Sequence, residues 1–467
     1  MKECSKHIRK FFILILLFTG CLAVLTARAD VTFQTLCLFK SSNPTAPLSP
    51  SGVLTEVETG NFYGTTQSGG TNGNGTVFLV TSTGVLTPIF KFNGFNGGSP
   101  NGLTLGADGD LYGTTYQGGN VSLGFQNGTI FKITTNGVLT SLYWFGGTNG
   151  YNPIGGLIFG NDSNFYGVTA SGGSGNGTIF KANTNGAYTV LWRFNGTNGS
   201  YPGGSLAFGK DGTLYGITQF GGVNYNGDFT GNGTLFRITT NGLLTTLAFF
   251  NGTNGSNPKA SLTLGNDGAF YGTTSLGGAF NLGTVFQITT NGILTTLLSF
   301  NGTNGSRPFG GLAQGADGVF YGTTAFSVSN GTNWGTVFGI TTNAILTTLI
   351  YLNGTNGLHG VSNMTLGHDG NLYGPMFDVQ GRVALDGSWG NIFRLVKQPL
   401  VSATPKNGGT VLSWNSVTNG VYRLDWKSSL TNPSWIPLAT NTATGNTTSF
   451  TNSPFNATQR FYRVVLP

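Results

Sequence analysis

The sequence predicts an all-β protein: a seven-bladed β-propeller closed by its N-terminal strand, followed by a small C-terminal β-sandwich-like domain. Three observations lead to this prediction. The dipeptide Tyr-Gly recurs seven times at spacings of 49 to 56 residues, each unit holds four short strand-like segments, and tight-turn dipeptides separate those segments. Repeats of this length indicate solenoids or propellers, and turns that join antiparallel neighbours favour the propeller. The repeated tyrosines are Tyr63, Tyr112, Tyr166, Tyr215, Tyr271, Tyr321 and Tyr373.

One unit illustrates the expected blade. Its strands are predicted at 261–264, 269–274, 284–289 and 293–300. Asp267-Gly268 joins the first two strands and Asn291-Gly292 joins the last two. Both dipeptides tolerate the positive φ that tight hairpin turns need, so neighbouring strands should be antiparallel.

The N-terminus is predicted to close the ring. The seven units supply only six fourth strands, and the segment 31–39 matches the fourth strand 293–300. Phe33, Leu36 and Phe39 fall at its apolar positions. Losing these three anchors should cost on the order of 5 to 9 kcal/mol, at about 1.5 to 3 kcal/mol each.

The first 29 residues read as an export signal, with basic residues, then an apolar run, then Ala27-Arg28-Ala29 as the cleavage site. A secreted mature chain would start near Asp30; a lipoprotein site at Cys21 is the less favoured alternative. Without the five basic residues and one acid of the signal, 17 basic and 14 acidic residues remain. This small excess of positive charge does not indicate a nucleic-acid-binding protein. Outside the signal, no other stretch is long enough to span a membrane. We expect a monomer.

The composition also bears on stability. The chain has 467 residues, 78 of them glycine, and only 8% are charged, but its 36 phenylalanines are enough for a packed core. The mature chain keeps one cysteine, Cys37, so no internal disulfide is expected. Its alignment with apolar positions of the other blades predicts a buried small hydrophobe rather than a reactive thiol.

The propeller is predicted to span 30–396 and a second domain 397–467. Alternating strands are expected at 410–414, 421–427, 435–439, 447–451 and 460–466. The pattern resembles a fibronectin type III or immunoglobulin-like sandwich, in which Trp414 occupies the tryptophan strand and 461–464 a late core strand.

The propeller repeat resembles the GloVer tandem-repeat family, also called choice-of-anchor repeat proteins, whose units read roughly D-G-x-L-Y-G-T-T, then G-G, then G-T-V-F. Residues 267–290 carry this pattern as DGAFYGTTSLGGAFNLGTVFQITT, and the resemblance covers about 53–396. It implies export and surface display. It brings no catalytic residue and no cofactor to this chain.

Most polar motifs are interpreted as structural turn residues and not as functional sites. Six aspartates share one turn position, where hydrogen bonding to nearby backbone is favoured over calcium binding, because one carboxylate per turn supplies too few oxygens. They are Asp108, Asp162, Asp211, Asp267, Asp317 and Asp369. The Asn-Gly-Thr triplets read as turns rather than glycosylation acceptors. His359 and His368 lack further ligands, so no metal site is predicted.

Function is expected on one rim. Insertions concentrate between the second and third strands of a blade, at 120–126, 223–230, 326–334 and 375–389, and should share a face with the inter-blade crossovers. Aromatic and charged residues of these loops are the candidate ligand-binding residues, since flat rings beside amides suit sugars; self-packing of the loops is the alternative. They are Phe125, Tyr225, Phe326, Trp334, Phe377, Arg382 and Trp389, with Phe229 nearby.

We therefore expect a non-catalytic binding or adhesion scaffold, with an extracellular glycan or cell-surface component as its partner. A polysaccharide hydrolase or lyase is the alternative, using carboxylates among Asp228, Asp378 and Asp386. Scarce glutamate and the lack of a Ser-His-Asp arrangement argue against it. A structural cell-surface protein is the third possibility.

Overall fold

The computed structural model describes residues 31–467 except 41–45, 121–125, 228, 329–333, 355–362, 378–383, 385–386, 398–400, 407–408, 417–420, 428–433, 446, 453–460 and 466–467. The export signal therefore lies outside the described residues. The chain forms two compact units. One contains Gln34–Gly367 and Leu372–Arg394, and the other consists chiefly of Leu395–Pro467.

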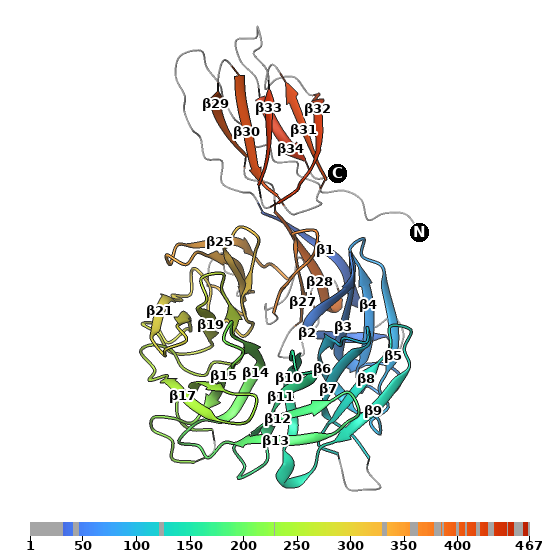
Figure 1. Ribbon diagram of the computed structural model, residues 1–467, viewed down its shortest axis with the longest axis vertical. Helices are drawn as coiled ribbons and strands as arrows, with labels where there is room; N and C mark the ends of the chain where they lie inside the picture. Colours follow the sequence, from blue (N-terminus) through green and yellow to red (C-terminus); the bar gives the residue numbers. More distant parts are fainter. Residues whose placement is uncertain are drawn as a thin grey trace. The chain divides into compact units, whose positions relative to one another are not determined.

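Seven four-stranded sheets form the predicted seven-bladed propeller, and we number the blades in chain order (Figure 1). Blades 1 to 3 contain β2 (Pro47–Glu58), β3 (Asn61–Gly69), β4 (Thr76–Thr81), β5 (Leu86–Lys91); β6 (Gly98–Leu105), β7 (Leu111–Gln117), β8 (Thr129–Ile133), β9 (Leu139–Trp144); and β10 (Tyr151–Phe159), β11 (Asn164–Ser171), β12 (Thr178–Asn183), β13 (Tyr188–Arg193). A short 3-10 turn, η2 (Gly147–Asn149), precedes β10.

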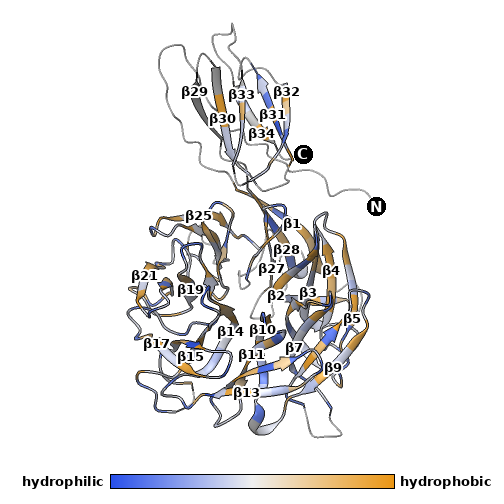
Figure 2. Cartoon of the chain, viewed as in Figure 1, coloured by the Kyte–Doolittle hydropathy of each residue, from blue (hydrophilic) through white to orange (hydrophobic). Residues whose placement is uncertain are grey.

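Blades 4 to 6 repeat this order. They contain β14 (Ser200–Phe208), β15 (Leu214–Phe220), β16 (Thr234–Ile238), β17 (Leu244–Phe249); β18 (Thr263–Leu264), β19 (Phe270–Thr274), β20 (Thr284–Ile288), β21 (Leu294–Ser299); and β22 (Ala313–Gln314), β23 (Phe320–Thr324), β24 (Thr336–Ile340), β25 (Leu346–Tyr351). Many strand segments are coloured as hydrophobic in Figure 2, which agrees with the buried clusters found between successive blades.

Blade 7 is built from both ends of the propeller sequence. Its sheet has the order β1–β28–β27–β26, from β26 (Thr365–Leu366), β27 (Leu372–Met376), β28 (Ser388–Lys397) and β1 (Val31–Lys40). The blue strand β1 lies beside the orange-brown β28 in Figure 1. The predicted closure by the N-terminal strand is thus confirmed, with one more residue in the strand than expected.

The closing contacts repeat those between other blades. The Phe39 ring meets Phe78 of blade 1 edge-on, at a centroid distance of 5.3 Å and an interplanar angle of 66°. Phe300 meets Phe338 of the next blade at the same distance and angle. The apolar anchors of β1 are nevertheless unequal, because Phe39 is fully buried whereas Leu36 is only half-buried.

A second closing contact runs along the inner strands. Thr365 Oγ1 of blade 7 donates to the Leu54 carbonyl oxygen of blade 1 at 2.7 Å. Thr55 makes the same 2.7 Å bond to Leu103 between blades 1 and 2. The last blade therefore joins the first as any blade joins the next, and no sheet edge is left open at the seam.

The repeated Tyr-Gly pair has a packing origin. Tyr271 stacks on Phe320 of the next blade with ring centroids 4.0 Å apart, and its hydroxyl donates to Asp267 Oδ2 at 2.7 Å. A Cβ on Gly272 would stand 2.5 Å from Phe286 Cζ, so the phenylalanine that recurs in the third strand of each blade needs glycine beside it. Tyrosine, glycine and phenylalanine thus form one interlocked unit that each blade repeats.

The turns differ in detail from the expectation. The strands are antiparallel, as predicted. Only the glycine of each dipeptide has a positive φ, +85° at Gly268 and +92° at Gly292. Gly265 N–H donates to the Ala269 carbonyl at 2.8 Å, and Gly268 N–H to the Gly265 carbonyl at 2.9 Å, which makes a three-residue turn with a left-handed glycine.

The unit that contains Leu395–Pro467 has two three-stranded sheets, β29–β30–β33 and β32–β31–β34. They comprise β29 (Val401–Lys406), β30 (Gly409–Asn415), β31 (Val421–Lys427), β32 (Ile436–Thr442), β33 (Thr447–Asn452) and β34 (Phe461–Val465). Trp414, Tyr422 and Tyr462 share their buried core. The strand β29 was missed by the sequence analysis.

Candidate functional site

The two families of long loops do lie side by side. The β7–β8 loop of blade 2 contacts the crossover that leaves blade 1, where Gly119 N–H donates to the Gly94 carbonyl at 2.8 Å. The same bond joins Gly222 to Gly196 at 2.9 Å and Gly278 to Gly252 at 2.8 Å. These loops form what we call the long-loop rim, as the sequence analysis expected.

The crossover asparagines brace their own loops. Asn93 N–H donates to Asn96 Oδ1 at 3.0 Å, and Asn96 N–H donates to Asn93 Oδ1 at 3.1 Å. In the later blades Asn251 and Asn254 form the same reciprocal pair. The Asn-Gly-Thr phrase is therefore a turn in the structure, with its side-chain oxygens used locally.

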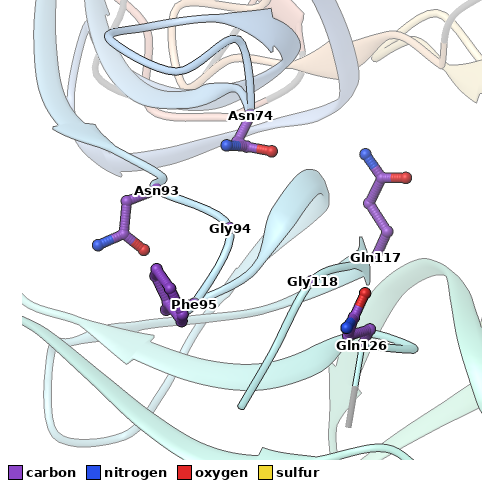
Figure 3. A pocket seen from close by; sticks show the side chains of 7 residues that line it. All are labelled: Asn74, Asn93, Gly94, Phe95, Gln117, Gly118 and Gln126. Atoms are coloured by element: carbon purple, nitrogen blue, oxygen red, sulfur yellow. The ribbon is translucent and has the colours of Figure 1, made fainter. Parts of the chain in front are cut away.

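A pocket opens on this rim between blades 1 and 2 (Figure 3). It has a volume of about 310 Å³. Its lining comes from the β3–β4 loop, the crossover between the blades, and the end of β7 with the loop after it. The lining residues are Asn74, Asn93, Gly94, Phe95, Gln117, Gly118 and Gln126.

The pocket combines neutral amides with one aromatic ring. Phe95 is 63% exposed, although phenylalanine is normally buried. Asn74 Nδ2 donates to the Asn72 carbonyl at 3.3 Å, and Gln117 Nε2 donates to Ser99 Oγ at 3.3 Å. Within the described part of the chain, no donor is bonded to Asn74 Oδ1. The lining holds no ionisable side chain, so it suits a neutral ligand that has hydroxyl groups and an apolar face.

The sequence-predicted binding residues are spread over several blade junctions. Tyr225 lies on the rim between blades 3 and 4, where its hydroxyl donates to Asn176 Oδ1 at 3.0 Å. Phe326 is half-buried beside the Arg307 guanidinium, 5.9 Å from its ring centroid. Trp334, also half-buried, lies two residues before β24, next to Gly335.

Two further candidates belong to blade 7. Phe377 follows β27 and is half-buried, whereas Trp389 lies inside β28 and not in the predicted loop. Gly390 precedes Phe393 by three residues, as Gly75 precedes Phe78 in blade 1, and a Cβ on Gly390 would meet Pro50 of blade 1 at 2.7 Å. Pro375 likewise lies within β27. Phe125, Arg382, Asp228, Asp378 and Asp386 lie outside the described residues.

Sequence reasoning missed the lining residues of the pocket. The sequence did contain one indication. The six crossovers between blades carry variants of Phe-Asn-Gly-Thr-Asn-Gly, and Phe95 stands where the other five have threonine, as in Thr197 and Thr253. The remaining lining residues are ordinary turn amides and carry no such mark.

The turn aspartates behave as turn residues. Asp162 Oδ1 accepts from Asn164 N–H at 3.3 Å and its Oδ2 from Tyr166 at 2.7 Å. Burial alone would raise the pKa of Asp162, but these hydrogen bonds outweigh it and hold the pKa below its usual value. In the described residues, no group of three His, Cys, Asp or Glu could hold a metal ion.

Cys37 lies in β1 against the closing cluster of blades 7 and 1. Burial raises the pKa of its thiol to about 12, despite a hydrogen bond with the Ile392 backbone. A thiol with so high a pKa is protonated at neutral pH and a poor nucleophile, which agrees with the predicted structural role.

The fold and the repeat define a seven-bladed propeller of glycine-punctuated units. The family model of the Gloeobacter/Verrucomicrobia repeat matches residues 19–137, 124–230 and 222–422, so the chain belongs to that family. No curated protein matches it in sequence. Across the described residues, no helix is long and apolar enough to cross a membrane.

A lectin of known structure shares the fold. The BP39L lectin from Burkholderia pseudomallei superposes with a TM-score of 0.51 at 8% identity, over 79% of this chain and 96% of the lectin. A gluconolactonase from Xanthomonas campestris gives a TM-score of 0.41 at 12% identity, over 82% of this chain and 94% of that chain. At 8% identity the likeness to the lectin concerns the fold alone.

Proposed function

We propose that this protein is an exported, non-catalytic scaffold that binds a neutral glycan in the pocket between blades 1 and 2. The observation that carries the proposal is the lining: four amide side chains and an exposed phenylalanine, with no ionisable group. Sugar hydroxyls exchange hydrogen bonds with amides, and the C–H face of a pyranose packs on an aromatic ring. A lectin with the same fold makes a propeller reasonable for this role, although it identifies no ligand here.

The test is a glycan array probed with the mature chain and two single variants. Phe95→Ala should weaken retention about 2- to 10-fold, by losing an aromatic contact worth about 0.5–1.5 kcal/mol. Phe280→Ala is the matched control, because Phe280 is 59% exposed in a loop of blade 5 and lies outside the pocket. Equal effects of the two variants would contradict the proposal.

Charge and turnover supply independent readouts. A neutral ligand in an uncharged pocket should be retained equally from about 0.05 M to 0.5 M salt, since there is little for ions to screen. Retention lost at high salt would place recognition elsewhere. Released reducing ends from dye-labelled polysaccharides would favour the hydrolase or lyase alternative.

We also infer that the C-terminal unit is a fibronectin type III or immunoglobulin-like module, supported by its two three-stranded sheets around Trp414. Export is supported by residues 1–29 and by the family resemblance. N-terminal sequencing of the secreted protein should begin at Asp30. Limited proteolysis should cut near Lys397 and leave two resistant fragments; a single fragment spanning the junction would contradict the two-domain division.

A further inference from the structure

Three aromatic rings gather on the long-loop rim of blade 4. Tyr201 lies at the start of β14, Phe220 at the end of β15 and Phe229 in the β15–β16 loop. The ring centroids of Tyr201 and Phe229 are 5.6 Å apart, those of Tyr201 and Phe220 6.1 Å, and those of Phe220 and Phe229 5.4 Å. Each ring therefore contacts the other two, and we call the set the aromatic platform.

The platform is open to solvent. Phe229 is 63% exposed, and Tyr201 and Phe220 are half-buried. A loop that only packed on itself would cover its phenylalanine, which is normally a buried residue. The two neighbouring rings hold Phe229 in place, so little side-chain freedom is left to lose when a ligand binds. An exposed ring that is held in this way is suited to recognition.

The backbone of the platform is in an unfavourable conformation. Tyr201 and Phe229 have φ values of +56° and +59°, and within the described residues they are the only aromatic residues with positive φ. Asparagine is enriched in this conformation, whereas a bulky side chain is disfavoured. In the other blades, the position of Tyr201 has positive φ at Ser49, Ser99, Asn152, Asn257 and Arg307. Such strain tends to be kept at binding sites, which favours a functional role for the two rings.

The platform is joined to the pocket through the end of β7. Gln117 lines the pocket (Figure 3), and the residue before it, Tyr116, is exposed. Burial and a side-chain hydrogen bond with Tyr116 raise the pKa of Tyr201 to about 12. Blade 3 lies between these two tyrosines in the ring, and its Asn152 Nδ2 donates to the Tyr116 carbonyl oxygen at 2.8 Å. The pocket and the platform are thus neighbouring parts of one rim, with Tyr116 between them.

We propose that the aromatic platform is a second sugar subsite, and that one neutral oligosaccharide runs from the pocket past Tyr116 onto Phe229. The Phe229 ring packs against the apolar face of one sugar unit, and the hydroxyls of Tyr116 and Tyr201 exchange hydrogen bonds with the sugar hydroxyls. This deepens the proposed function and rests on it, because the pocket holds one end of the chain. The ligand class is then a linear polymer of neutral sugars and not a single sugar.

The test measures affinity against chain length. Titration calorimetry of the full mature chain uses glucose, mannose and xylose oligomers of one to eight units. Affinity should rise with length in the series that binds, and then level off once both subsites are filled. Phe229→Ala should lower the affinity for the longest oligomers about 2- to 10-fold and leave that for the shortest unchanged. An affinity that does not depend on length would overturn the inference.

Two further variants control for indirect effects. Phe280→Ala should change affinity at no length, because Phe280 is 59% exposed in the β19–β20 loop, the counterpart in blade 5 of the loop that carries Phe229. Tyr201→Asn should fold, since Asn152 and Asn257 hold the same positive φ in other blades. It should weaken the binding of long oligomers as Phe229→Ala does. Unchanged binding of long oligomers in both platform variants would overturn the inference.

Phe95→Ala separates this inference from the proposed function. If Phe95→Ala weakens binding at every length and Phe229→Ala at none, the pocket stands and the platform is not a subsite. If Phe229→Ala weakens binding and Phe95→Ala does not, the pocket proposal fails, and the path from pocket to platform fails with it. A dimer in sedimentation that dissociates in Phe229→Ala would assign the platform to a second copy of the chain and overturn the sugar subsite.

Discussion

Substituting Phe39 tests the closing strand directly. Phe39 is 1% exposed and meets Phe78 across the junction of blades 7 and 1. Removing a fully buried phenylalanine ring costs about 3–5 kcal/mol, from lost transfer energy and from the cavity left behind. Phe39→Ala should therefore lower the free energy of unfolding, measured by urea denaturation, by that amount.

Phe300→Ala is the matched control. Phe300 is fully buried and meets Phe338 at the same 5.3 Å and 66°, but its strand is continuous with the blades on both sides. The two variants should lose similar stability. Only Phe39→Ala should also release β1, because that strand is tethered to the ring at one end; hydrogen exchange of peptides from 31–40 would show it. A loss below about 1 kcal/mol in Phe39→Ala beside a full loss in Phe300→Ala would refute closure by packing.

The remaining predictions concern the repeat. Gly272→Ala should cost about 2–3 kcal/mol in thermal or urea unfolding, because its Cβ would stand 2.5 Å from a buried ring, whereas Gly268→Ala meets nothing within 4 Å and should cost only about 1 kcal/mol for its positive φ; a reversed order would contradict the packing argument. The lowered pKa of Asp162 contributes stability that is complete above about pH 4 and is lost as pH falls through the folded-state value, so Asp162→Asn should flatten the acid limb of a stability–pH curve. Burial and the hydrogen bond to Asp108 raise the pKa of Tyr112 to about 12, so its contribution is full below about pH 10 and is lost as pH rises towards 12; an absorbance titration that shows all tyrosines ionising near pH 10 in the folded protein would contradict this.

The sequence predicted the propeller well because each blade repeats the same set of packing contacts. The spacing of Tyr271-Gly272 from Phe286 encodes one interlocked contact, and seven copies leave little freedom in the count of blades. The closing strand was equally predictable, since 31–39 carries the pattern of a fourth strand. The strand β29 was missed because Pro405 interrupts its pattern, and proline is unusual inside strands.

The candidate site was harder to predict because it depends on side-chain placement between blades. Tyr225 has the sequence features of an exposed contact residue, yet it packs on Gly196 and bonds to Asn176. The crossover after blade 1 reads Asn-Gly-Phe-Asn-Gly, and it differs from the common Asn-Gly-Thr-Asn-Gly only at Phe95. Neither outcome follows from periodicity, which describes what the blades share and not where they differ.

Because β1 pairs with β28, the propeller strand that is synthesised first must wait for the strand that is synthesised last. The first strand of the propeller, Val31–Lys40, reaches its partner only after some 350 further residues have been synthesised. Bringing such distant segments together carries a loop-closure cost and slows folding, although that cost grows only logarithmically with length. A chain truncated before Ser388 would lack the hydrogen-bonding neighbour of its own first strand, so the ring can be completed only once nearly all of the propeller sequence has been made.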